Sequence, residues 1–287
     1  MGDLPQIGPG ERRPRTITVP RHWTDHHFQG RAVLPAVEAM QLLAHWVGGR
    51  QPSVDSGTIV SARFTKFLPL AAAGETMTVA LEITDPGMAG AQAALTTRVS
   101  ARTARMSRTV VHVQAVFGQT AERVAYTPQP PAADPDPPDV EVPPHRIYAE
   151  LVPFGPAYRN ISHPLHLWPH GALARVQAPR ITDPQTDQPL GSPFVLDAAF
   201  HAACVWSQRY AGVVAFPVGL DQRRVHQKTM PGGNYLANIV AVQKAPKQLS
   251  FDIHIADSSG DVCETVHGVQ MRDVSGGRMK PPNWIAR

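Results

Sequence analysis

The sequence predicts an α+β fold made of two similar units, in each of which an antiparallel sheet wraps one long apolar helix. Three observations predict it. A proline-rich, acidic segment divides the 287 residues almost in half. Each half contains one stretch whose apolar residues recur at helical spacing. In each half, segments with the alternation of half-buried strands follow that stretch.

The dividing segment covers residues 127–144 and reads TPQPPAADPDPPDVEVPP. Proline has no backbone N–H, and the segment has almost no large apolar side chains to bury. We therefore expect a stiff, extended linker; a long surface loop is the alternative. The expected organisation is a flexible N-terminal segment over residues 1–15, one unit over 16–126 and a second unit over 145–287.

In the first half a helix is predicted after residue 34. Pro35 suits the first helical position, apolar residues follow at helical spacing, and the pair Gly48-Gly49 ends the pattern. Strands are predicted at residues 58–68, 76–84, 94–101 and 109–117. The last of these, TVVHVQAVF, alternates apolar and polar side chains as a half-buried strand does.

The second half repeats this plan. Pro193 precedes a predicted helix over residues 195–210, which carries an apolar face. Two short strands are predicted before that helix, at residues 166–168 and 172–178. Four more are predicted after it, at residues 218–227, 235–242, 249–256 and 262–271.

Composition and charge argue against several classes of function. The net charge is +4, but the arginines are scattered and form no stripe with interleaved aromatic residues, so nucleic acid binding is not expected. No apolar stretch approaches the about 20 residues that span a bilayer, and no leader with an apolar centre is visible, so a cytoplasmic location is expected. Cys204 and Cys263 are too few for a disulfide framework and are expected to be buried, reduced thiols.

The motifs of metal and nucleotide sites are missing from the sequence. Among the 13 histidines there is no HxH or HExxH spacing, and the chain contains no GxSxG, P-loop or GxGxxG pattern. We expect neither a metal nor a nucleotide cofactor. A site that works by acid–base chemistry alone is what remains.

Two short clusters carry residues suited to that chemistry. The first places Asp25 and His26 before Gly30 and Pro35. Glycine lets a ligand approach the backbone closely, and the free N–H groups of the helix that starts at Pro35 can polarise a carbonyl. On its own, this histidine has the ordinary interpretation of a structural residue.

The second cluster lies on the second predicted helix, where Asp197 precedes His201 by one turn. Residues four apart share a helix face, so His201 could orient the carboxyl group of Asp197. On its own, Asp197 is also explained as an early carboxylate that the helix dipole favours.

Together the two clusters make the chain resemble the dehydratase domains of modular polyketide synthases. That family's HxxxGxxxxP motif is met by His26, Gly30 and Pro35, and its DxxxQ or DxxxH motif by Asp197 and His201. Its YGPxF motif is approximated by the FGPAY of residues 154–158. The resemblance extends over about residues 16–274, with the motifs in the family's order.

The sequence departs from the family's pattern at three places. Ala36 follows Pro35 where glycine is usual, and Ser192-Pro193 replaces a common His-Pro. Phe154 lacks the hydroxyl of the family's tyrosine, whereas Tyr158 has a hydroxyl that the usual phenylalanine lacks. If the family's tyrosine helps to bind substrate, that role is missing here or has moved to Tyr158.

The resemblance implies a double hotdog fold and a lyase that dehydrates a 3-hydroxyacyl thioester in polyketide or fatty-acid-like biosynthesis. In that mechanism His26 removes a proton next to the thioester carbonyl, and Asp197 donates a proton to the departing hydroxyl. Contacts with substrate are expected at six residues: Gly30, Pro35, Gly155, Pro156, Tyr158 and His201.

The resemblance also implies partners. The substrate would arrive on the phosphopantetheine of an acyl carrier protein, other polyketide synthase components would surround the domain, and a homodimer is compatible with the family. No dissociable cofactor is expected.

Other reactions stay open at this point. The same His/Asp pair could serve a double-bond isomerase, or a cyclase of the pyran-forming or product-template-like kind. Classes further away are a thioesterase-like hotdog and a non-catalytic module that binds acyl chains or docks partners.

Overall fold

The structure, a computed structural model, describes residues 11–51, 54–84, 90–100, 107–119, 136–183, 185–245 and 248–286. Within these residues, the first half contains a short 3-10 turn η1 (Arg21–Asp25), one helix α1 (Ala36–Gly48) and seven strands: β1 (Glu11–Thr18), β2 (His27–Phe28), β3 (Arg31–Ala32), β4 (Val54–Phe64), β5 (Thr76–Thr84), β6 (Ala91–Ser100) and β7 (Ser107–Gln119).

The second half contains three short helical turns, one long helix and eight strands within the described residues. The turns are α2 (Pro144–Arg146), η4 (Ile147–Leu151) and η5 (Pro156–Tyr158), and the long helix is α3 (Pro193–Tyr210). The strands are β8 (Val140–Val142), β9 (Leu165–Trp168), β10 (Gly171–Gln177), β11 (Phe216–Leu220), β12 (Gln222–Val225), β13 (Asn234–Ala245), β14 (Gln248–Asp257) and β15 (Val262–Arg272).

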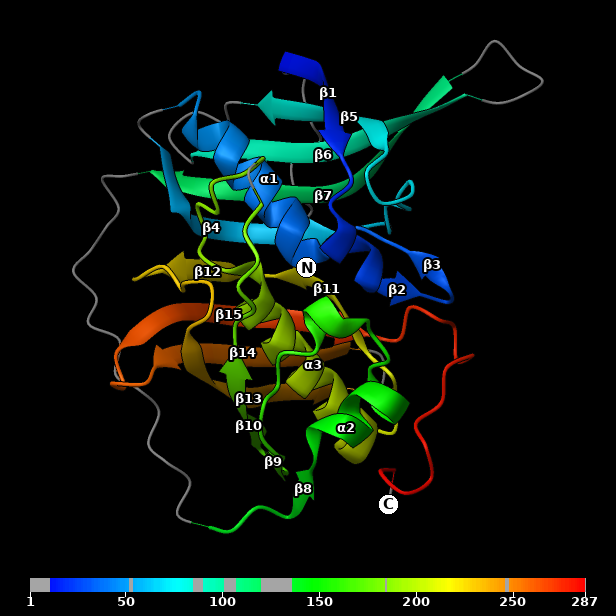
Figure 1. Cartoon of the computed structure of the whole chain (residues 1–287), viewed down its shortest axis with the longest axis vertical. Helices are drawn as coiled ribbons and strands as arrows, with labels where there is room; N and C mark the ends of the chain where they lie inside the picture. Colours follow the sequence, from blue (N-terminus) through cyan, green and yellow to red (C-terminus); the bar gives the residue numbers. More distant parts are fainter. Residues whose placement is uncertain are drawn as a thin grey trace.

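One antiparallel sheet runs through both halves in the order β1-β5-β6-β7-β4-β11-β15-β14-β13-β10-β9-β8, and β12 pairs with both β4 and β15. The halves join where β4 meets β11 and β12: Ala62 pairs with Leu220, and Ile59 pairs with Arg223. In Figure 1, α1 crosses one part of this sheet and α3 crosses the other. This is the double hotdog architecture predicted from the sequence.

Helix α1 begins after Pro35, whose φ of −60° and ψ of 143° make it the residue that precedes the first helical one. The sequence predicted Pro35 one position further in, inside the first turn. Either position suits proline, because its missing N–H would lack a helical partner there. The helix ends at Gly48, as predicted.

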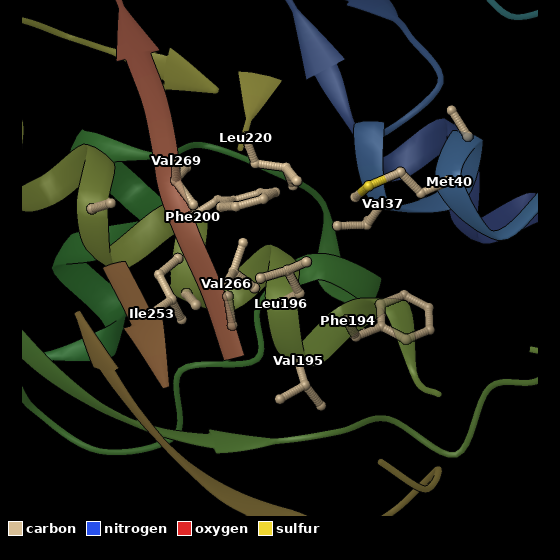
Figure 2. Close-up of a cluster of buried hydrophobic side chains, with 14 of the residues drawn as sticks. Val37, Met40, Phe194, Val195, Leu196, Phe200, Leu220, Ile253, Val266 and Val269 are labelled. Carbon is tan, nitrogen blue, oxygen red and sulfur yellow. The ribbon is translucent and has the colours of Figure 1, made fainter. Parts of the chain in front are cut away.

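Helix α3 is buried on nearly its whole circumference, from Pro193 to Gln208. A helix buried to this extent must be covered by other elements on nearly every side. The sheet covers one side and α1 contributes to another. Figure 2 shows Val37 and Met40 of α1 on the side of Phe194 and Leu196 of α3, while Phe200 lies near Leu220 and Val269 of the sheet. Each such side chain stabilises the fold by roughly 1.5–3 kcal/mol when fully buried.

The predicted strands are present, and the second predicted strand, residues 76–84, agrees to the residue with β5. The predicted strand 218–227 is in fact two strands, β11 and β12, that break at Asp221, and β11 carries a register shift between Pro217 and Gly219. The two cysteines are free and buried, as predicted.

Two predicted boundaries were wrong. Residues 11–15 were assigned to a flexible segment, but they form most of β1, which pairs with β5 along its whole length. The predicted linker, residues 127–144, ends too late: Val140–Val142 forms β8 on β9, and Pro144 opens α2. Residues 127–135 of that segment lie outside the described residues. The division into two units stays a prediction.

Among the described residues, no helix has both the length and the apolar character needed to cross a membrane.

Candidate active site

A cavity of about 1130 Å³ is lined by residues of both halves. From the first half it includes His26 and Ala36, and from the second half Asp197 and His201. Other lining residues, such as Lys66 and Arg272, are exposed at the protein surface. The cavity therefore extends from the surface to the part of its lining that includes His26 and Asp197.

A tight hairpin holds the backbone of His26. Its N–H donates to the carbonyl of Trp23 at 3.2 Å, and its carbonyl accepts from the N–H of Val33 at 3.0 Å. Between β2 and β3 the chain turns at Gln29 and Gly30, which have φ values of 50° and 76°. Two successive positive φ values define the turn that matches the twist of a hairpin, and glycine adopts them without strain. Gly30 thus shapes the hairpin that carries His26.

Aromatic rings surround the imidazole of His26. Phe154 stacks on it with ring centres 4.2 Å apart, and Tyr158 presents its ring at an angle of 73° with centres 5.4 Å apart. His26 remains partly accessible because it lines the cavity.

The enclosed position of the imidazole among these rings determines the protonation state of His26. Burial lowers the pKa of His26 from 6.5 to about 4, and the nearby Asp197 opposes that lowering only in part. Desolvation disfavours the charged imidazolium. At neutral pH the ring is therefore uncharged and can accept a proton.

One face of α3 lines the cavity. Phe200 and His201 follow Asp197 by three and four residues, and Cys204 follows them by four and three, so the four residues form a single stripe along the helix. Asp197 and His201 are each 4% exposed. Burial raises the pKa of the Cys204 thiol to about 12, so this cysteine stays an uncharged lining residue.

Asp197 and His201 touch without forming a well-aligned hydrogen bond. Nε2 of His201 lies 2.9 Å from Oδ2 of Asp197. Within the described residues, however, neither atom has a hydrogen bond of acceptable angle, and neither does Nδ1 of His201. Buried polar atoms left in this state are costly unless a ligand or water satisfies them. The stripe on α3 thus carries buried donors and acceptors without hydrogen-bond partners beside the cavity.

The loop at residues 154–158 is fixed to the residue that precedes His26. The N–H of Gly155 donates to the carbonyl of Asp25 at 2.7 Å, and the N–H of Ala157 donates to its carboxylate at 2.9 Å. A Cβ on Gly155 would lie 2.5 Å from Cγ of Asp25, so only glycine fits there. This contact places Phe154 against the imidazole of His26.

Of the six predicted substrate contacts, His201 alone lines the cavity. Gly30 forms the hairpin turn, and Pro35 precedes α1. Gly155 packs beside Asp25, Pro156 begins η5, and Tyr158 is fully buried with its hydroxyl directed to Glu38. Apart from His201, these residues lie around the cavity rather than in its lining, and contact with substrate at each of the six stays a prediction.

Several lining residues escaped the sequence analysis. Phe200 and Cys204 could have been found from their spacing to Asp197. His112, which has no motif of its own in the sequence, lines the cavity while its ring nitrogens bind Thr97 Oγ1 at 2.8 Å and the carbonyl of Lys66 at 3.1 Å. No local sequence pattern predicts that His112 lines the cavity. In the part of the chain that the structure describes, no three His, Cys, Asp or Glu side chains gather to hold a metal ion.

Fold and cavity together define a double hotdog protein in which an imidazole and a carboxyl group share one apolar chamber. The chain belongs to the polyketide synthase dehydratase family: residues 126–281 match the family described as polyketide synthase dehydratase N-terminal domain. Domains of this family are hydro-lyases that act on 3-hydroxyacyl thioesters.

Two curated relatives agree with this membership. The chain is 31% identical over 216 residues to a polyunsaturated fatty acid synthase polypeptide of Thraustochytrium sp., with 72% of the chain covered. It is 27% identical over 270 residues to polyketide synthase ThaG of Burkholderia thailandensis, with 88% covered. The matches span only 7% and 4% of the length of these relatives.

Solved structures share the fold. A trans-AT polyketide synthase dehydratase domain from Brevibacillus brevis superposes with a TM-score of 0.71 at 18% identity. The match covers 94% of this chain and 96% of the other.

Proposed function

We propose that this chain removes water from a 3-hydroxyacyl thioester carried on the phosphopantetheine of an acyl carrier protein, and so makes an α,β-unsaturated thioester in polyketide or fatty-acid-like biosynthesis. The observation that carries the proposal is that His26 and Asp197, from different halves of the chain, line one cavity. Its apolar walls suit an acyl chain, and its exposed end suits the entry of a long, thin arm.

His26 is the base in this reaction. Its lowered pKa keeps the ring neutral, so a ring nitrogen can take the proton from the carbon between the thioester carbonyl and the hydroxyl-bearing carbon. The electron pair of that C–H bond forms the new double bond as the C–O bond breaks. The hydroxyl leaves as water after it receives a proton from Asp197. Transfer of the proton from His26 back to Asp197 restores the starting state.

The start of α1 supplies the third element. Ala36, the first helical residue, lines the cavity beside Leu34. The first N–H groups of a helix have no partner within it and carry the positive end of the helix dipole. We assign to them the thioester oxygen, on which negative charge develops during proton removal. On α3, His201 keeps Asp197 and the departing hydroxyl in place through its unused ring nitrogens.

The partners follow from the substrate. Membership of the family implies interaction with other polyketide synthase components, and the carrier protein belongs to this proposal. The homodimer, the cytoplasmic location and a reaction without a dissociable cofactor stay predictions.

The test is product analysis after incubation with short 3-hydroxyacyl thioesters. We expect loss of one water from the substrate mass in the wild type, and loss of that activity in His26→Ala and Asp197→Asn. His45→Ala is the matched control, because His45 is half-exposed and does not line the cavity. An unsaturated product of unchanged mass would favour the isomerase, a ring product the cyclase, and free carrier thiol the thioesterase-like alternative. Turnover unchanged in His26→Ala would falsify the assignment.

A further inference from the structure

A buried polar group lies directly behind His26 and has no part in the mechanism above. It consists of Tyr158, Glu38 and His22. The Tyr158 hydroxyl donates to Oε1 of Glu38 at 3.4 Å, and Nε2 of His22 lies 3.4 Å from the same oxygen. Tyr158 is fully buried and Glu38 is 1% exposed. We call these three residues the Glu38 cluster.

The Glu38 cluster joins the three segments that build the site. His22 lies on η1, four residues before His26. Glu38 lies in the first turn of α1, two residues after Ala36. Tyr158 ends η5, in the loop that carries Phe154. A shift of any one segment would therefore stretch contacts within this cluster.

The ring of Tyr158 transmits this constraint to the imidazole. Tyr158 meets the edge of His26, and Phe154 stacks on its face. Tyr158 also packs against Phe194 at the start of α3, with ring centres 5.2 Å apart. Because the hydroxyl of Tyr158 is held by Glu38, its ring has a fixed position from which it limits the rotation of His26.

The direction of the hydroxyl argues against a role in binding substrate. Tyr158 does not line the cavity, whereas Phe154 does. Burial raises the pKa of Tyr158 far above 10, so the hydroxyl stays a donor at every working pH. Burial also raises the pKa of Glu38, an effect that His22 opposes and that Asp183 and Asp197 reinforce. A buried carboxyl group of this kind needs its hydrogen-bonding partners.

We propose that Tyr158 and Glu38 are positioning residues that hold the His26 ring in its reactive orientation. In this chain the hydroxyl of Tyr158 thus supports His26 from outside the cavity lining. Phe154, which lines the cavity, has no hydroxyl group. The inference rests on the proposed function, since it assigns these residues to that reaction.

The first test is Tyr158→Phe, which removes one oxygen and keeps the ring. Misplacement of a reacting group by about 1 Å can cost ~10²-fold in rate. We expect kcat to fall by about 10-fold to 10²-fold while KM changes by less than about 3-fold, because the cavity lining is intact. Tyr210→Phe is the matched control: its hydroxyl also donates to a carboxylate, Asp139, at 3.2 Å, but away from the cavity. A kcat of Tyr158→Phe equal to that of the control overturns the inference.

Glu38 provides a second, independent test. Glu38→Gln keeps an oxygen that accepts from Tyr158 and should keep kcat within about 3-fold, whereas Glu38→Leu should lose as much as Tyr158→Phe. The double variant Glu38→Leu/Tyr158→Phe should be no worse than either single variant, because both act through one contact. Equal activity of the Gln and Leu variants contradicts the inference, even if Tyr158→Phe folds poorly.

A third variant separates positioning from substrate binding. Phe154→Tyr returns a hydroxyl to the cavity and should not rescue Tyr158→Phe. Rescue would show that the hydroxyl acts on substrate and would overturn the positioning role. His26→Ala separates the proposed function from the positioning role. If His26→Ala abolishes dehydration while Tyr158→Phe retains full dehydration activity, the proposed function stands and the positioning role fails. If His26→Ala keeps dehydration, both fail.

Discussion

The carboxylate of Asp25 accepts a hydrogen bond of 2.9 Å from the backbone N–H of Ala157, a residue in the other half of the chain. A second bond joins the carbonyl of Asp25 to the N–H of Gly155. Two sequence motifs far apart in the chain are thereby held together immediately beside His26. The position of the base is therefore set by both halves.

This contact predicts the effect of a methyl group at position 155. In Gly155→Ala the new Cβ would lie 2.5–2.6 Å from the side chain of Asp25, closer than atoms tolerate. We expect a loss of about 1–3 kcal/mol in unfolding free energy, measured by urea denaturation. The control is Gly48→Ala, whose Cβ would meet Ser56 at an ordinary 3.5 Å. In an Asp25→Gly background the cost of Gly155→Ala should shrink; an undiminished cost would contradict the assigned clash.

The pKa of His26 predicts how stability depends on pH. The folded imidazole titrates at about 4 and the unfolded one at 6.5, so between these values the unfolded chain binds more protons. The contribution of His26 to the free energy of unfolding is fully present above pH 6.5 and is lost as the pH falls toward 4. The full effect is roughly 3.4 kcal/mol at most. His26→Asn should flatten the pH dependence in that window, and His45→Asn should not.

Activity should follow the same titration. Dehydration needs the neutral imidazole, so the acid limb of the profile of kcat/KM should lie near pH 4, well below 6.5. The measurement is the initial rate at low substrate concentration between pH 4 and 8. An acid limb at pH 6.5 would show that His26 is not buried in the working enzyme.

A buried glutamine connects α1 with the segment that leads into α3. Oε1 of Gln41 accepts from the N–H of Leu190 at 3.0 Å, and its Nε2 donates to the carbonyl of Gly191. Gln41→Leu leaves both backbone groups unsatisfied and should cost about 2–4 kcal/mol in thermal or urea unfolding. Gln41→Glu keeps the first bond but loses the donor to Gly191 and buries a charge, so it should also be strongly destabilising at neutral pH. Gln270→Leu, which breaks an exposed bond to Asp221, serves as the control with a change within about 0.5 kcal/mol.

The buried ion pair of Arg223 and Glu264 anchors β12 on β15. Its two bonds measure 2.7 and 3.2 Å, and the side chains are 0% and 2% exposed. Glu264→Leu strands a buried guanidinium and should lower the unfolding free energy by about 3–5 kcal/mol. Arg223→Met/Glu264→Leu should recover a large part of that loss. If the double variant is no more stable than the single one, the cost lies in packing rather than in the stranded charge.

Long, regular elements were readable from the sequence because their pattern is local. The apolar spacing of α3 and the alternation of β7 are properties of neighbouring residues. Strand β1 escaped because it is an edge strand whose residues, Arg12 to Thr16, are exposed and include Pro14. Edge strands accept proline and charge, so their sequences look like loops.

The site was predictable to a smaller extent. The motif spacing pointed to His26 and Asp197, and the structure places both on one cavity. The hydroxyl of Tyr158 was expected near substrate, yet its direction depends on Glu38, 120 residues away in the chain. Contacts of that range leave no trace in local spacing.

The sheet that passes from β4 into β11 and β12 makes each half the cover for the other's open edge. Two fragments that separate the halves are expected to stay associated, because β4 pairs with β11 and β12. Either fragment produced alone would present unpaired strand hydrogen bonds to water and would tend to self-associate. Reconstitution of activity from two co-expressed fragments is therefore a realistic engineering route, whereas a minimal single-hotdog version is not.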